Sequence, residues 1–471
     1  MERFNGLDTM FLNAETATMH MHVVGVMIFD PSTAPSGYSF EQVRDVVASR
    51  LDLLKPFRRR AVQVPFHLHH PLWVEDPEFD LDYHLRRACL PSPGGMSELE
   101  DFVAEVAGRP LDLNRPLWEM YVVEGMKDGK VALVTKTHHA AIDGVSGAEL
   151  AASFLDLEPE PRKIDPPQHP WVPERIPSDY ELAAYALVSL AFQPLTAMRA
   201  VRRTIEMITA LTERNRTSST PPPPAPFTAP RTKFNASITA HRRLALTDVS
   251  LEQVKAIKRA VGCTVNDVIL ALCAGALRSY LIAQDDLPED PLVAMVPISV
   301  RTENERDALG NRLSAMLVSL PTTVQDPLQR LSILVESTSH AKEQGRAIGA
   351  ETLMNWAEFA APALAARAAR LVSSIRLFDR FRPAFNVTIS NIPGPNFPLY
   401  GAGAQMVAMY PLGPIVEGIG LNITVMSYMG KLFFGILGCR ELVPSMELLV
   451  QGIQDSLSEL RDRTAGWNSA R

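Results

Sequence analysis

Two adjacent histidines, His138 and His139, are the residues of this chain best suited by type and spacing to do chemistry. Asp143 and Gly144 follow them, so the stretch runs His-His-Ala-Ala-Ile-Asp-Gly. Imidazole has an unperturbed pKa close to neutral pH, which suits it to accept and donate protons. The Asp143 carboxylate can accept hydrogen bonds and hold a turn, and Gly144 permits a backbone angle that side chains disfavour. A structural histidine pair is the alternative, but these offsets favour proton transfer.

The sequence before the histidine pair predicts the element that positions it, a β-strand. Val131 to Val134 is a β-rich run, and small residues after Gly144 predict a tight turn followed by a helix. Residues 120–124 and 130–137 predict a hairpin across Lys127-Asp128-Gly129. We therefore expect the histidines at the mouth of a buried strand.

The sequence before the hairpin predicts three further elements. Residues 5–15 predict a short helix, and 20–29 a strand on which His20 and His22 share one face. A core or surface role for these two histidines is favoured over metal binding. Residues 97–108 predict a helix with a Ser97–Glu100 capping box.

Two further short stretches attract attention. In Pro116-Leu117-Trp118, Pro116 stiffens a loop and Trp118 can bury a large apolar area, so packing near the site is expected. Asn266-Asp267 precede a long apolar helix over 268–282. Thr264 or Asn266 can cap that helix, but an Asn carboxamide near a helix start can also donate to a developing oxyanion. Asp267 suits support of the fold.

Composition excludes several classes of protein. A net charge of −7 over 471 residues argues against a general nucleic-acid binder, and the length predicts two or more domains. The four cysteines form no CxxC pair, which favours a reduced, cytosolic protein. We expect no signal peptide, no apolar run long enough to span a bilayer, and no metal at the histidine run 67–70, which lacks Cys or carboxylate at ligand spacing. No GxSxG, P-loop or GxGxxG motif follows a strand, which weighs against lipases, nucleotide hydrolases and dinucleotide oxidoreductases.

A composition shift suggests how the chain is divided. We predict a first domain over 1–160, a helical and Pro-rich linker over 161–235, and a second domain over 236–471. Stripes of apolar residues flanked by arginines at 195–214 and 364–382 suit docking on anionic lipid. An ordinary surface helix is the alternative for the second of them.

His138-His139-x-x-x-Asp143-Gly144 resembles the HHxxxDG motif of the CoA-dependent acyltransferase superfamily. That superfamily includes chloramphenicol acetyltransferase, the condensation domains of peptide synthetases and the bacterial wax ester synthase/diacylglycerol acyltransferases. Pro116-Leu117-Trp118 and Asn266-Asp267 are similar to the PLW and ND motifs of the last group. Residues 296–301, Val-Pro-Ile-Ser-Val-Arg, and 385–395, which end in Ile-Pro-Gly-Pro, also resemble that group, so the resemblance covers nearly the whole chain.

The resemblance implies a fold and a set of roles. The fold class is α/β of the α+β type, with two chloramphenicol-acetyltransferase-like domains of mixed sheets flanked by helices and an active-site tunnel between them. His139 is the implied general base, His138 positions the ring or lines the tunnel, and Asn266 stabilises the oxyanion. Asp143 holds the loop. Gly144, Pro116, Trp118 and Asp267 are the expected substrate-site residues.

The implied reaction is transfer of a long-chain acyl group from acyl-CoA to the hydroxyl of diacylglycerol, giving triacylglycerol. Long-chain alcohols, giving wax esters, are a second acceptor class. Acyl-CoA is a co-substrate, and no cofactor, metal or nucleic acid is expected. The expected location is the cytoplasm, peripherally at the inner face of the plasma membrane and at lipid droplets. The alternatives are a condensation-type acyltransferase fed by a carrier protein and a non-catalytic lipid-binding or lipid-droplet protein.

Overall fold

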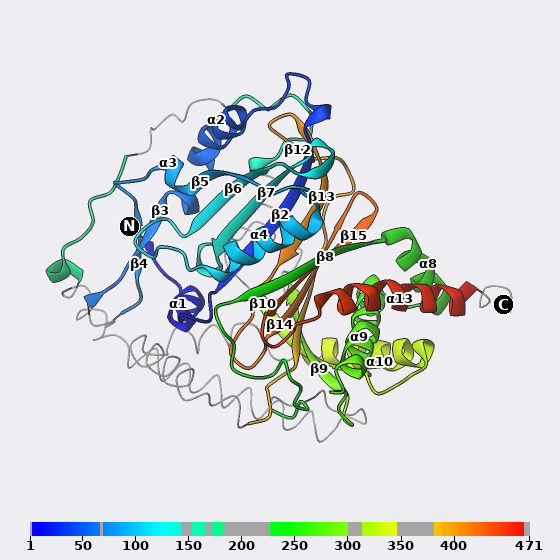
Figure 1. Ribbon diagram of the computed structural model, residues 1–471. Helices are drawn as coiled ribbons and strands as arrows, with labels where there is room; N and C mark the ends of the chain where they lie inside the picture. The colour runs from blue at the N-terminus through cyan, green and yellow to red at the C-terminus, as the bar shows by residue number, and fades with distance from the viewer. Residues whose placement is uncertain are drawn as a thin grey trace.

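Two six-stranded mixed sheets form the framework of the molecule, as the computed structural model shows (Figure 1). The structure describes residues 2–65, 69–142, 153–164, 172–182, 227–299, 313–345 and 381–465, together with 184 and 224. Both sheets combine parallel and antiparallel pairs. The mixed α/β fold predicted from the sequence is confirmed.

The first sheet has the strand order β12-β13-β2-β7-β6-β5. Its strands are β2 His22–Asp30, β5 Leu85–Cys89, β6 Trp118–Glu124, β7 Val131–His138, β12 Tyr400–Gly401 and β13 Ala404–Leu412. The predicted hairpin is present as β6 and β7, which pair antiparallel. β13 pairs with β2 along most of its length, although it belongs to the part of the chain that we assigned to the second domain. The two halves therefore interlock through a shared sheet.

The second sheet has the order β10-β9-β11-β14-β15-β8. Its strands are β8 Arg242–Ser250, β9 Leu292–Ser299, β10 Leu313–Leu320, β11 Val387–Ile392, β14 Leu421–Tyr428 and β15 Lys431–Cys439. β14 and β15 form a hairpin whose turn includes Gly430, with a φ of 76° that favours glycine. A small sheet of β1 Glu2–Arg3, β4 Leu72–Glu75 and β3 Arg59–Val62 lies beside the first sheet.

Helices cover these sheets. They are α1 Gly6–Ala14, α2 Phe40–Arg50, α3 Leu81–His84, α4 Met96–Gly108, α8 Leu251–Val261, α9 Val265–Ala283, α10 Pro327–Gly345 and α13 Met446–Ala465. Figure 1 shows α9, α10 and α13 grouped beside the second sheet and α4 next to β8, where the halves meet. One apolar core joins α9 and α13 to the second sheet, and another includes strands of both sheets.

Two expectations about helices need correction. By length and composition α9 is apolar enough to cross a membrane, contrary to the expectation that no run would be, yet 72% of its apolar window is buried inside the fold. The predicted Ser97–Glu100 capping box is also wrong. α4 begins earlier, so that Gly95 donates its backbone N–H to Glu98 Oε2 at 2.7 Å. Glu100 instead accepts a hydrogen bond from the backbone of Leu246 in β8, at 2.8 Å.

Candidate active site

The histidine pair lies where β7 ends. His138 is the last residue of the strand, and His139 begins a 3-10 turn over His139–Ile142. The His138 backbone N–H donates to Leu117 O at 2.9 Å, and the His139 N–H donates to Met21 O at 2.7 Å. These contacts fix both backbones between neighbouring segments on either side, so the position of the pair is set by the sheet.

The His139 ring is half-buried beneath helix α1. The ring of Phe11 lies against it, with centroids 4.2 Å apart and planes tilted by 38°. Burial is the main cause that lowers the pKa of His139 to about 4. The imidazole is therefore neutral at pH 7, with a nitrogen lone pair available to accept a proton.

His138 is fully buried and faces other polar groups. Its Nδ1 accepts a hydrogen bond from the Ala140 backbone N–H at 3.1 Å. Its Nε2 lies 3.5 Å from Glu15 Oε2. The edge of the His22 ring points at the His138 ring, with centroids 6.0 Å apart, because His22 is opposite His138 in the β2–β7 ladder. His138 thus belongs to a buried polar cluster, whereas His139 is more open.

Leu117 and Trp118 of the PLW stretch take different roles. Leu117 supplies the carbonyl that holds His138 and packs in a small core with Ala140 and Ala141. Trp118 is 1% exposed, donates its indole N–H to Phe57 O at 2.8 Å, and stacks on His84 with centroids 4.6 Å apart. Since Trp118 pairs with Thr137, its side chain lies on the face of the sheet opposite His138.

Pro116 contacts this region through its backbone. Its carbonyl accepts a hydrogen bond from the Trp118 N–H at 2.8 Å, and it forms an isolated bridge with Arg60. These placements match the packing role expected for the stretch. The substrate contacts predicted for Pro116 and Trp118 stay predictions, and the deep burial of Trp118 does not favour them.

Asn266 and Asp267 are in the first turn of α9. Thr264 and Asp267 form the capping box: the Thr264 backbone N–H donates to Asp267 Oδ2 at 2.9 Å, and the Thr264 side chain accepts from the Asp267 N–H. Asp267 Oδ1 accepts from Thr338 Oγ at 2.7 Å. The Asp267 carboxylate is therefore engaged by the fold, as support for the helix start requires, and its predicted substrate contact gains no support.

Asn266 is half-buried and takes no part in the cap. Its Oδ1 accepts from the Nδ2 of Asn391, in β11, at 3.5 Å. With the oxygen directed to Asn391, the NH2 of Asn266 is left to act as a donor. Asp143, Gly144 and Arg301 fall outside the described residues, as do 195–214 and 364–380.

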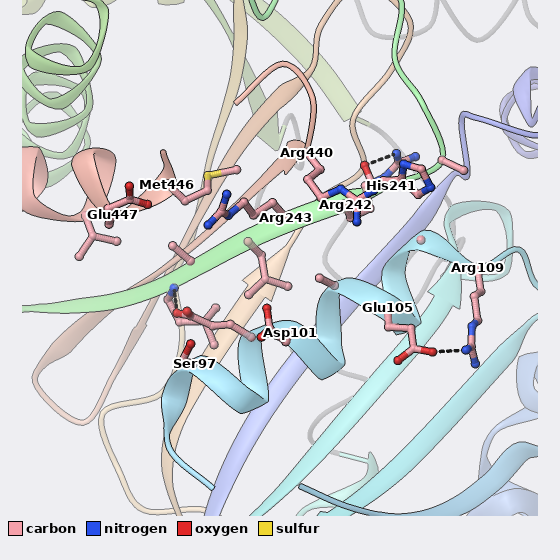
Figure 2. A pocket seen from close by; sticks show the side chains of 18 of the residues that line it. Ser97, Asp101, Glu105, Arg109, His241, Arg242, Arg243, Arg440, Met446 and Glu447 are labelled. Atoms are coloured by element: carbon pink, nitrogen blue, oxygen red, sulfur yellow. Dashed lines mark hydrogen bonds and ion pairs between the residues drawn. The ribbon is translucent and has the colours of Figure 1, made fainter. Parts of the chain in front are cut away.

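A cavity of about 870 Å³ is lined by residues of α4, β8 and the start of α13 (Figure 2). Four arginines and four carboxylates line it: Arg109, Arg242, Arg243, Arg440, Glu100, Asp101, Glu105 and Glu447. Gly108 also lines it, and the Gly108 carbonyl accepts from His20 Nε2 at 3.2 Å. The cavity therefore lies between the two halves of the chain. Gly108 connects it, through His20, to the polar cluster around His138. The tunnel predicted from the sequence stays a prediction.

Sequence reasoning missed two residues that touch the histidines. Glu15 ends helix α1 and points at His138, and Phe11 of the same helix covers His139. The one sequence feature that pointed to Phe11 and Glu15 was the place of their helix. The predicted helix over 5–15 comes directly before the strand that carries His20 and His22. Among the described residues, no group of three or more His, Cys, Asp or Glu side chains is arranged to hold a metal ion.

The two mixed sheets belong to a chloramphenicol-acetyltransferase-like fold, as the solved structures similar to this chain show. A starter condensation domain of rhizomide synthetase, solved with C8-CoA, shares this fold, with a TM-score of 0.56 at 12% identity over 98% of this chain and 94% of that one. The wax ester synthase/diacylglycerol acyltransferase from Marinobacter aquaeolei VT8 is nearer, with a TM-score of 0.70 at 31% identity over 99% and 100% of the two chains.

The sequence comparisons identify the family. Residues 4–269 match the wax ester synthase/diacylglycerol acyltransferase catalytic domain, and residues 309–461 match the C-terminal domain of the same group. A Mycobacterium tuberculosis protein named as a diacylglycerol O-acyltransferase is 37% identical over 461 residues, which cover 98% of this chain and 90% of the relative. The chain belongs to the wax ester synthase/diacylglycerol acyltransferase family, and the resemblance stated from its motifs is confirmed.

Proposed function

We propose that this protein is an acyl-CoA-dependent O-acyltransferase that converts diacylglycerol to triacylglycerol. Family membership supports the class of reaction. The observation that carries the mechanism is the neutral, half-buried imidazole of His139, held at the end of β7 by the backbones of its neighbours. A base that is unprotonated at pH 7 can take the proton of an alcohol as the oxygen attacks.

In the proposed mechanism His139 removes the hydroxyl proton of the acceptor, and the oxygen attacks the thioester carbonyl carbon of acyl-CoA. The tetrahedral intermediate collapses with cleavage of the C–S bond. Protonated His139 returns the proton to the leaving sulfur, so that the products are the ester and free CoA thiol. General-base catalysis of this kind contributes about 10²–10⁴ in rate.

The negative charge that develops on the carbonyl oxygen needs a donor. We assign this role to the NH2 of Asn266, because Asn391 engages the oxygen of the same amide and so fixes which end is free. His138 positions the turn that carries His139, and Asp143 holds the loop that follows. The thioester is already activated, so direct attack needs neither a covalent acyl-enzyme nor a cofactor or metal.

The acceptor is tested with purified protein and radiolabelled palmitoyl-CoA. Dioleoylglycerol and hexadecanol are supplied in separate reactions, and the neutral lipids are separated by thin-layer chromatography. We expect labelled triacylglycerol, with wax ester as a second product. Activity with acyl chains only when they are bound to a carrier protein would support the condensation-type alternative, and binding of both lipids without thiol release would support the lipid-binding alternative.

We also propose that the protein works in the cytoplasm at the surface of the plasma membrane and of lipid droplets, where diacylglycerol is held. The support is the apolar acceptor and the arginine-flanked stripes at 195–214 and 364–382. Flotation with vesicles of phosphatidylglycerol and phosphatidylcholine tests this proposal. Binding should rise with the anionic lipid and fall with added salt, and equal recovery with purely zwitterionic vesicles would contradict it.

A further inference from the structure

Glu15 directs one buried carboxylate at three histidine rings. Its Oε2 lies 3.5 Å from His138 Nε2, and its Oε1 lies 3.7 Å from His22 Nε2 and 3.8 Å from His20 Nδ1. The Glu15 side chain is 9% exposed, and that of His138 is fully buried. A carboxylate this far from water is costly unless nearby donors compensate it, so the arrangement calls for a role.

The contacts of His138 define which ring nitrogen carries its proton. The Ala140 N–H donates to Nδ1, so Nδ1 must be unprotonated and the neutral ring carries its proton on Nε2. Nε2 faces Glu15 Oε2 at 3.5 Å, and among the described residues neither atom makes a hydrogen bond to any group. The tautomer that Ala140 requires is therefore the one that Glu15 attracts.

We propose that Glu15 is a positioning residue for acyl transfer, which holds His138 in the Nε2–H tautomer so that His138 can fix the turn carrying His139. The chain of contacts runs from the Glu15 carboxylate to His138, then to the Ala140 amide one residue beyond His139. The inference rests on the proposed role of His139 as base. Glu15 acts through His138 and does not itself touch substrate.

The other groups packed around Glu15 keep the carboxylate ionised. Burial by itself raises the pKa of Glu15, but the contacts with His138 and His20 outweigh it and hold that pKa below its usual value. Burial holds the pKa of His22 well below its usual value, and the charge of Lys136 acts in the same direction, so His22 stays neutral. Among the described residues, Arg242 is a further cation that acts on His22, and its guanidinium donates to Thr18 O at 2.6 Å.

The test combines a spectroscopic and a kinetic readout on the full chain. In protein labelled with ¹⁵N-histidine, the two ring nitrogens of a neutral imidazole have distinct shifts, and His138→Gln assigns the signals of His138. Wild type should show the Nε2–H form. Glu15→Ala should reduce the share of that form at His138, because only the Ala140 amide then favours it. It should also lower kcat about 10- to 100-fold, the range expected for loss of a buried contact with a charged group, with KM unchanged for both substrates.

Two more conservative substitutions at Glu15 complete the test. Glu15→Gln retains an acceptor oxygen and should keep the tautomer and most of kcat. Glu15→Asp withdraws the carboxylate by one methylene and should shift the tautomer part of the way, which also covers a Glu15→Ala protein that fails to fold.

Glu119→Gln is the matched control. It removes another buried carboxylate beside β7, whose ion pairs among the described residues are with Lys136 Nζ at 3.0 Å and with Arg86. It should cost stability while leaving the His138 signals and kcat unchanged. Glu15 variants that behave in the same way, with the Nε2–H signal and kcat intact, would overturn the proposal. Retained activity in His139→Ala would instead reject His139 as the base. The two failures can be told apart, because the tautomer of His138 is read out without turnover.

Discussion

The ring of Phe11 lies against the ring of His139, with their centroids 4.2 Å apart, so an apolar residue of the first helix covers the proposed base. The contact joins α1 to the turn after β7, two elements separated by more than a hundred residues. Its chemical consequence is desolvation, which is the main cause of the low pKa of His139.

The pH dependence of catalysis should reflect that pKa. The base works only when deprotonated, so activity is present above the pKa of His139 and is lost as the pH falls through it. We expect the acid limb of kcat/KM near pH 4, more than two units below that of an exposed histidine. Rates from pH 3.5 to 8, with circular dichroism at each pH to exclude unfolding, provide the measurement. A limb near 6.5 would contradict the burial argument.

Removal of the covering ring should move the limb. Phe11→Ala admits water to His139, which reduces desolvation and raises its pKa, so the acid limb of kcat/KM should shift upward by about one unit or more. Met10→Ala, a neighbouring substitution at an exposed position of the same helix, is the control and should leave the limb in place. Identical profiles for the two variants would show that Phe11 does not set the pKa.

Asn266 should matter for rate more than for stability. If its amide donates to the oxyanion, Asn266→Ala should lower kcat about 10²- to 10³-fold and leave KM nearly unchanged. The thermal midpoint should hardly move, because Thr264 and Asp267 make the helix cap. Asn391→Ala, which frees the Asn266 amide to turn, should give a smaller loss of kcat. A change in kcat of less than about threefold for Asn266→Ala would remove this residue from the mechanism.

Glu100 predicts a pH-dependent stability. Burial raises the pKa of Glu100 to about 7, above its unfolded value, so the folded state holds the proton more tightly. The stability that this proton confers is present below about pH 4.5 and is lost as the pH rises through 7. Glu100→Gln, which cannot ionise, should be more stable than wild type at pH 8 by about 1 kcal/mol, a value reduced for partial exposure, and nearly equal to it near pH 4.5.

Chemical denaturation at the two pH values measures this difference. Glu105→Gln, on the same helix but ion-paired with Arg109 at the surface, controls for the loss of a carboxylate from α4. The same stability difference at both pH values would mean that Glu100 does not titrate as described.

Local patterns in the sequence predicted much of the fold. The β6–β7 hairpin and the buried helix α9 follow from the period of their apolar residues and from turn residues. The pairing of β13 with β2 does not, because a strand's alternation shows which face is buried but not which distant strand is its neighbour. The Ser97–Glu100 pattern gave a wrong prediction for a related reason. Glu100 accepts a hydrogen bond from the backbone of β8, and local sequence does not show such a tertiary contact.

The residues of the candidate site also divide into those that the sequence predicted and those that it did not. His138, His139 and Asn266 stood out because their residue types suit proton transfer and oxyanion binding. Glu15 and Phe11 did not, since a carboxylate at a helix end and a phenylalanine on an apolar face are common, and only the packing of α1 on the turn after β7 gives them meaning.

The most direct measurement is thiol release from palmitoyl-CoA with dioleoylglycerol by wild type and by His139→Ala, with folding of the variant checked by its thermal midpoint. Loss of the base should lower kcat by about 10²–10⁴ while the variant remains folded. Triacylglycerol formation by a folded His139→Ala protein at the wild-type rate would contradict the account.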